Sequence, residues 1–128
     1  MKKSLICFGI ALMTFSNFAM AENPANHKES IEIINGRSVT PLCTAISKGD
    51  IAIVRKFIEY GANVNEKSNG MTPLMIAARY NNVEIIKLLL DNGADLYAKN
   101  ENNFTALKFA QLSNASEAVE YLSSRMKK

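Results

Sequence analysis

Apolar residues recur at helical spacing in two segments of the chain that lie 32 residues apart. In each segment they occupy positions i, i+1, i+4 and i+5, which form one stripe along a helix. The two stripes consist of Ile53, Val54, Phe57 and Ile58, and of Ile85, Ile86, Leu89 and Leu90. The pattern predicts two amphipathic helices at equivalent places in a repeated unit.

A shorter helix is predicted before each stripe, and its first residues repeat as well. Thr40-Pro41-Leu42 recurs 32 residues later as Thr72-Pro73-Leu74, and 33 residues after that as Thr105-Ala106-Leu107. A threonine hydroxyl can accept a backbone N–H at the start of a helix, and proline is tolerated at the first helical position. Gly49 and Asn81 suit the left-handed conformation that ends a helix. The sequence therefore predicts three units of two helices each.

The blocks GMTPLMIAA, VEIIKLLL and GAD follow one another within residues 70–95, and residues 40–63 repeat most of this order. The order resembles an ankyrin repeat. The resemblance implies an all-α solenoid of about three stacked helix-turn-helix units, with short β-hairpin finger loops. In that family a histidine after Thr-Pro-Leu bonds to the threonine hydroxyl. Cys43, Met75 and Lys108 stand at that position here, so we expect this brace to be missing.

Five segments follow from the repeats and from the residues that precede them. Residues 40–71 and 72–104 are predicted to be the first and second repeats. Residues 105–128 are a degenerate third repeat that caps the array, since an end repeat faces water on one side and needs polar residues there. We interpret residues 22–39 as an N-terminal cap or linker and residues 1–21 as a signal peptide.

The N-terminus has the features of an export signal. Lys2 and Lys3 precede an apolar run from Leu5 to Phe15, and Ala19-Met20-Ala21 offers small residues to a signal peptidase. The run is shorter than the roughly 20 residues that cross a bilayer. An uncleaved membrane anchor is the alternative. We expect a periplasmic or secreted protein whose mature chain starts at Glu22 and is not held in a membrane.

Composition excludes several classes of protein. An apolar fraction of 48% supports a folded core, and a formal charge of +3 without a basic cluster predicts no nucleic-acid partner. One histidine and two cysteines are too few for a zinc site of four cysteines, or of two cysteines and two histidines. As a nucleophile, Cys43 would need a nearby histidine, and the only one is His27 in a polar terminal stretch. We expect neither cofactor nor catalysis.

A binding function fits the repeats best. The resemblance implies a non-catalytic module that binds a partner protein through its finger loops and concave helix face. One alternative is a dedicated inhibitor, immunity or regulatory partner of a single extracytoplasmic enzyme. Another is an enzyme or ligand carrier with an unrecognised site. We expect a monomer that unfolds in one step, because so short an array should be cooperative.

The resemblance also implies where a partner would bind. In the family, contacts come from the finger tips and from the ends of the first helices. The matching positions here are Lys48, Ser68, Asn69, Met71, Arg79, Tyr80, Phe104 and Leu112. We expect Met71, Arg79, Tyr80 and Phe104 to form the centre of the patch, because arginine and tyrosine are frequent interface anchors and methionine adapts to irregular surfaces. Alternatively, Met71 and Phe104 only pack against a neighbouring finger.

The export hypothesis predicts the N-terminus of the mature protein. N-terminal sequencing of the chain recovered from the periplasm or the medium should begin at Glu22, because the peptidase cuts after the second small residue, Ala21. Recovery of a membrane-bound form that still begins with Met1 would contradict the prediction.

Overall fold

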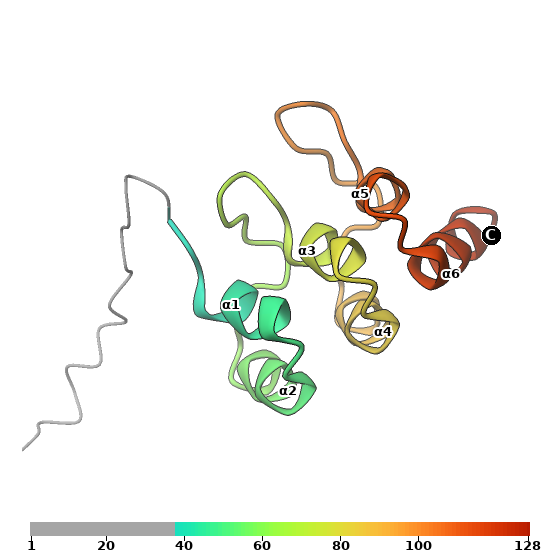
Figure 1. Cartoon of the computed structure of the whole chain (residues 1–128). Coiled ribbons are helices and arrows are strands. Elements are labelled where there is room, and N and C mark those ends of the chain that lie inside the picture. Colours follow the sequence, from blue (N-terminus) through green and yellow to red (C-terminus); the bar gives the residue numbers. More distant parts are fainter. Residues whose placement is uncertain (1–37) are drawn as a thin grey trace, which may run out of the picture. The chain divides into compact units, whose positions relative to one another are not determined.

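The computed structural model describes residues 38–128, which form six α-helices in three pairs (Figure 1). The helices are α1 (Pro41–Lys48), α2 (Ile51–Glu59), α3 (Pro73–Arg79), α4 (Val83–Asp91), α5 (Ala106–Leu112) and α6 (Ser116–Met126). The inner helix α3 packs between α1 and α5, and the outer helix α4 packs between α2 and α6. The predicted all-α stack of three units is confirmed. The predicted signal peptide (1–21), and the cap or linker as far as residue 37, lie outside the described residues.

Threonine begins the inner helix of each unit, as the sequence predicts. Thr40, Thr72 and Thr105 have extended backbones. Each hydroxyl accepts the N–H of the third residue after it, at 3.2, 3.2 and 3.3 Å respectively. A cap of this kind is typically worth about 1 kcal/mol. Gly49 and Asn81 follow α1 and α3 with φ of 72° and 56°, which confirms the predicted left-handed turns.

Met75 supplies a different contact at the place where the family has its histidine. The Thr72 N–H donates to Met75 Sδ at 3.4 Å, while the Thr72 hydroxyl accepts the Met75 N–H. Sulfur is a weak acceptor, but both side chains are buried, so the backbone N–H has no competing water. Two reciprocal bonds therefore close the start of α3 without a histidine.

Burial along the outer helices depends on whether a repeat precedes. Ile53, Ile85 and Ala118 all lie thirteen residues after their threonine. Ile85 and Ala118 are fully buried, whereas Ile53 is 46% exposed, so its predicted place in a buried stripe is wrong. This position faces the preceding repeat, and within residues 38–128 no repeat precedes the first. Helix α2 is correctly predicted, but burial of Ile53 would require a preceding repeat.

The opposite side of each repeat shows the reverse trend. Ile46 and Ala78 are fully buried six residues after their threonine, but Gln111 at the same position of the third repeat is exposed. Likewise Met75 is buried and Lys108 is exposed. These positions face the following repeat, and within residues 38–128 no repeat follows the third. The predicted polar face of the third repeat is confirmed for Gln111.

The first finger, residues 60–72, is a tight turn and not a two-stranded hairpin. Ser68 and Met71 form the single antiparallel bridge found in the described part of the chain, with N···O distances of 2.8 and 3.0 Å. Asn69 and Gly70 between them have φ of 53° and 78°. Positive φ at both central residues is what a type I′ hairpin turn requires. The turn of the predicted β-hairpin is therefore present in this finger, whereas its strands are not shown beyond the single bridge.

The second finger, residues 92–105, has a longer turn. Asn100 Oδ1 accepts the N–H groups of Asn102 and Phe104 at 3.0 and 2.9 Å, and Asn103 has a φ of 67°. A loop of three residues that ends in the left-handed conformation is the next common hairpin connection. The extra residue of this finger, visible in the sequence, therefore changes its turn type.

Two asparagines tie neighbouring repeats together through the backbone. Asn65 on the first finger donates to Gly93 O at 3.0 Å and accepts the Asp95 N–H at 2.8 Å. Asn81 Oδ1 accepts the Ala118 N–H at 2.9 Å. Ala115 is the N-cap residue of α6, and its side chain has no acceptor for a backbone N–H. The second repeat therefore caps a helix of the third.

Leu89 in α4 offers a test of the stack. It is fully buried in the repeat that has neighbours on both sides. Leu89→Ala should lower the free energy of unfolding by about 2–5 kcal/mol, because a cavity remains where the side chain was. Chemical denaturation would measure this loss.

Leu112→Ala is the matched control. It removes the same atoms from a side chain that is 57% exposed, so the free energy of unfolding should change by no more than about 0.5 kcal/mol. Equal denaturation midpoints for the two variants would contradict the described packing.

Candidate functional site

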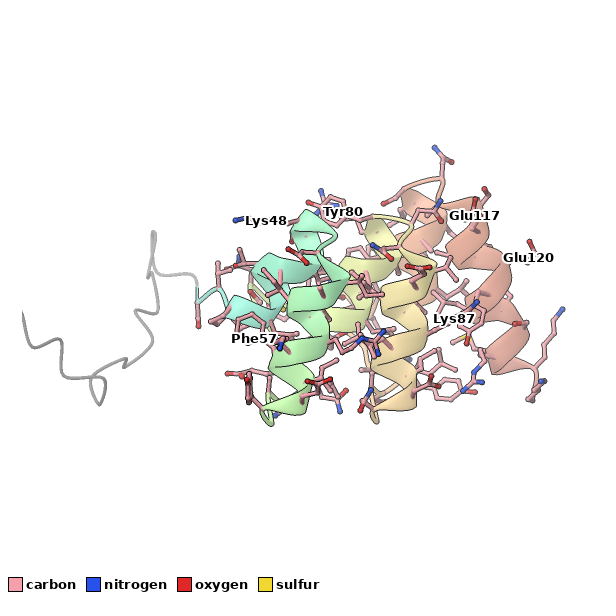
Figure 2. The ribbon with its side chains drawn as sticks, turned by 90° about the horizontal axis from the view of Figure 1, so that it is seen from below. Lys48, Phe57, Tyr80, Lys87, Glu117 and Glu120 are labelled. Atoms are coloured by element: carbon pink, nitrogen blue, oxygen red, sulfur yellow. The ribbon has the colours of Figure 1, made fainter. Side chains whose placement is uncertain are left out.

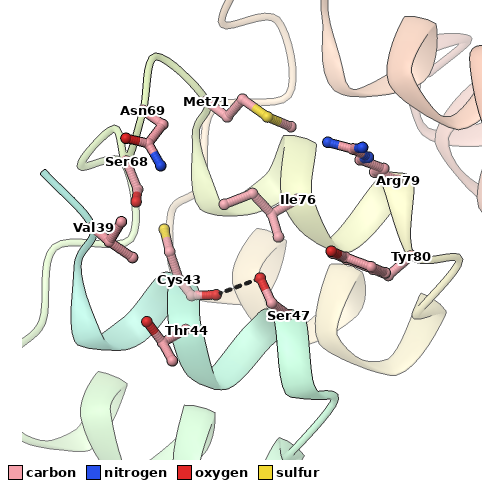
Figure 3. Close-up of a pocket in the computed structure, with 10 residues that line it drawn as sticks. All are labelled: Val39, Cys43, Thr44, Ser47, Ser68, Asn69, Met71, Ile76, Arg79 and Tyr80. Atoms are coloured by element: carbon pink, nitrogen blue, oxygen red, sulfur yellow. Dashed lines mark hydrogen bonds between the residues drawn. The ribbon is translucent and has the colours of Figure 1, made fainter. Parts of the chain in front are cut away.

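A hollow of about 260 Å³ lies between α1, α3 and the first finger (Figure 3). Its wall is polar along α1 and mixed along α3. The lining residues are Val39, Cys43, Thr44, Ser47, Ser68, Asn69, Met71, Ile76, Arg79 and Tyr80. Two adjacent repeats and the turn between them therefore build it together.

The end of α3 brings large side chains to this hollow. All six residues of α3 before Arg79 are buried. Arg79 is exposed, and Tyr80, which caps the helix, is 55% exposed. Figure 3 shows the side chains of Met71 and Arg79 pointing toward each other above Ile76. The exposed side chains of this helix are therefore confined to the wall of the hollow.

The α1 wall is held in place by its own backbone. The Ser47 hydroxyl donates to Cys43 O at 3.0 Å (Figure 3). The Thr44 hydroxyl donates to Thr40 O at 3.2 Å. Each hydroxyl retains acceptor capacity that a bound molecule can use. This side of the hollow therefore offers hydrogen-bond acceptors beside an arginine.

Five of the eight residues predicted to bind a partner line the hollow: Ser68, Asn69, Met71, Arg79 and Tyr80. Lys48, Phe104 and Leu112 do not line it. Figure 2 shows Lys48 and Tyr80 at the same end of the helices, where each inner helix turns into its outer partner. The structure thus gathers five members of the predicted set around the hollow and leaves the other three outside its lining.

Phe104, at the end of the second finger, packs on helix α5 of the third repeat. Its ring meets that of Phe109 edge to face, with centroids 5.9 Å apart and an interplanar angle of 76°. The alternative given from the sequence was packing against a neighbouring finger. The contact instead joins Phe104 to α5, where both rings are half-buried.

Ser68 has an internal role that the sequence did not reveal. It is 3% exposed, and its hydroxyl donates to Ser38 O and accepts the Thr40 N–H, both at 3.3 Å. The first finger is thereby fastened to the segment that enters α1. A side chain engaged in this way has little surface to offer a partner, so Ser68 positions the wall of the hollow.

Two apolar residues of the inner helices, Ile76 and Phe109, are not among those that the sequence predicted to bind a partner. Both lie four residues after their threonine, as does Thr44. Ile76 lines the hollow although only 8% of it is exposed, and Phe109 is half-buried. Counting from each threonine would have placed all three on the same face.

Cys43 forms a buried part of the lining, with 2% of its surface exposed. Burial raises the pKa of the Cys43 thiol, hydrogen bonds with Thr40 and Ser68 oppose the rise, and the charge of Glu66 adds to it. A protonated thiol is a poor nucleophile. By its position and its pKa, Cys43 is a small core residue.

Neither a metal cluster nor a membrane span emerges from the described residues. Within 38–128, no three His, Cys, Asp or Glu side chains gather closely enough to hold a metal ion. No helix in this range combines the length and apolar character needed to cross a bilayer.

The raised pKa predicts slow chemical labelling of Cys43. Dithiobis(nitrobenzoate) at neutral pH should react with it more than about tenfold more slowly in the folded than in the denatured chain, because the reactive thiolate is scarce and covered. The rate should increase as the pH rises toward the elevated pKa. A Cys7→Ser background keeps Cys43 the only thiol, and equal rates in the two states would contradict its burial.

Comparison with known proteins agrees with the repeat architecture. The family model for ankyrin repeats (three copies) matches residues 15–100 and residues 69–128. No curated protein matches the sequence. Ankyrin repeats generally act as protein–protein interaction modules. These matches span most of the chain, and its six helices stack in three pairs. The protein therefore belongs to the ankyrin repeat family.

Proposed function

We propose that this protein is a non-catalytic module that binds one partner protein on its inner face. The inner face comprises the residue before each repeat's threonine and the fourth, seventh and eighth residues after it. Its members are Val39, Thr44, Ser47, Lys48, Met71, Ile76, Arg79, Tyr80, Phe104, Phe109, Leu112 and Ser113. The observation that carries the proposal is the hollow, which seven of these residues line.

The chemistry of the inner face supports protein binding. Tyr80 and Leu112 are 55% and 57% exposed, and Arg79, the residue directly before Tyr80, is exposed as well. Tyrosine and arginine are enriched among the residues that carry most of the binding energy at protein interfaces. Met71 beside them can adapt to the shape of a partner. These side chains lie outside the fully buried core and are therefore available for binding.

We propose that this binding occurs outside the cytoplasm, in the periplasm or the surrounding medium, because the sequence predicts an export signal. We propose that the mature protein acts there as a monomer. A dedicated inhibitor, immunity or regulatory protein would use the same face. Loss of activity of one captured enzyme on stoichiometric addition of the chain would identify that form of the function.

A double substitution tests the inner face. The partner would be captured from periplasmic extract or medium, identified by mass spectrometry, purified and titrated. Arg79→Ala with Tyr80→Ala should weaken binding by about 2 kcal/mol or more, roughly 30-fold, because an anchor pair is lost. Unfolding should remain at the wild-type midpoint, since both side chains are exposed.

The matched control replaces the same residue types on another surface. Arg55 and Tyr60 are exposed on α2 and at its end, and Tyr60 is 82% exposed. Arg55→Ala with Tyr60→Ala should leave binding unchanged. If the inner-face variant folds and binds as tightly as this control, the partner docks elsewhere on the repeats.

A further inference from the structure

The inner face changes from polar to apolar along the three repeats. The fourth residue after the threonine is Thr44 in the first repeat, Ile76 in the second and Phe109 in the third. The seventh is Ser47, then Arg79, then Leu112. The first repeat therefore presents hydroxyl groups, the third presents aromatic and aliphatic surface, and an arginine lies between them.

Charge is distributed unequally between the two rows of helices. The inner helices α1, α3 and α5 contain no aspartate or glutamate, and the inner face carries Lys48 and Arg79. Each outer helix contains at least one carboxylate, namely Glu59 in α2, Glu84 and Asp91 in α4, and Glu117 and Glu120 in α6. The inner face is therefore positive, whereas the outer helices carry charges of both signs.

The fingers do not cancel this charge. The first finger carries Glu66 next to Lys67, and the second carries Asp95 and Glu101 with Lys99. Lys67 Nζ donates to Lys99 O at 3.2 Å, which directs its charge toward the second finger. Glu66 is the carboxylate whose charge reaches Cys43. The fingers contribute both signs, so Lys48 and Arg79 set the sign of the inner face.

Arg79 is well placed to receive a carboxylate. Its guanidinium projects beside Met71 and over Ile76 at the edge of the hollow (Figure 3). Guanidinium and carboxylate groups form two parallel hydrogen bonds, which are stronger where apolar side chains exclude water. A basic residue in the last turn also suits the helix dipole, so its removal needs a stability control. The helix dipole does not determine where the Arg79 side chain points, and this side chain points over the hollow.

Resting on the proposed function, we propose that the partner presents a short acidic segment that also bears large apolar side chains. A carboxylate of this segment pairs with Arg79. Apolar side chains on one side of it lie over Phe109 and Leu112, and further acidic groups approach Lys48. Two cations beside an apolar surface match such a peptide and not a phosphate backbone, which needs an extended basic patch.

Selection from a peptide library tests this chemistry. Random displayed peptides of about 12 residues, long enough to lie along a groove in extended form, would be selected on the immobilised full chain. Aspartate and glutamate should be enriched together with aromatic or aliphatic residues. Replacing the acids of a selected peptide by their amides should weaken binding by about tenfold or more, because a charge-assisted pair is lost.

Charge-reversal variants of the protein provide a complementary experiment in the same selection. Lys48→Glu with Arg79→Glu should lose the acidic peptides and select basic ones. Arg55→Glu with Lys56→Glu makes the same change on exposed residues of α2 and should retain the wild-type peptides. Both variants must show the wild-type denaturation midpoint, which excludes a loss of binding through unfolding.

The outcomes separate this inference from the proposed function. Enriched peptides that lack an acidic excess, yet are lost with Tyr80→Ala, would overturn the inference and leave the inner face as the binding site. Peptides whose binding neither Tyr80→Ala nor the inner charge reversal affects would overturn both. A selection that enriches no peptide would overturn the inference of a short linear segment.

Discussion

Burial between neighbouring repeats is the interaction on which this fold depends. A pair of short helices cannot cover its own apolar side chains, so each pair buries them against the neighbouring pair. Leu89 and Leu122 are fully buried, whereas Phe57 at the same position of the first repeat is only half-buried. The same sequence position therefore has a different environment when a neighbour is absent. The middle repeat has a neighbour on each side, and Pro73–Ala78 are buried without a break.

Because stacking occupies the sides of each repeat, the inner face is free to take another composition. Thr44, Ile76 and Phe109 occupy one position and range from a hydroxyl to an aromatic ring, while the threonine caps at Thr40 and Thr72 are the same. Stability and recognition thus draw on different positions of one unit. The hollow forms where positions of the two kinds adjoin. Ser68 fastens the first finger to the segment before α1, and the next residue, Asn69, lines the hollow.

The features that the sequence predicts well are local ones. A threonine cap or a left-handed Gly49 depends on a few adjacent residues, and so the helices, their ends and the turns are confirmed. The exposure of Ile53 and the burial of Ser68 depend on segments far away in the sequence, and both were misjudged. The site was predicted only in part, again because local features are easier to predict. Arg79 and Tyr80 were identified because they lie at the end of a helix, whereas Ile76 is identified only when equivalent positions of the repeats are compared.

The two ends of the described array are chemically unequal. Ile53 leaves apolar surface on the side of the first repeat, whereas Lys108 and Gln111 replace Met75 and Ala78 on the side of the last. A duplicated unit placed before the first repeat would cover apolar atoms and gain stability. One placed after the third would bury an unpaired ammonium group, which is costly. Gene duplication can therefore lengthen this array readily in only one direction, and Lys108 would have to change before growth could occur in the other.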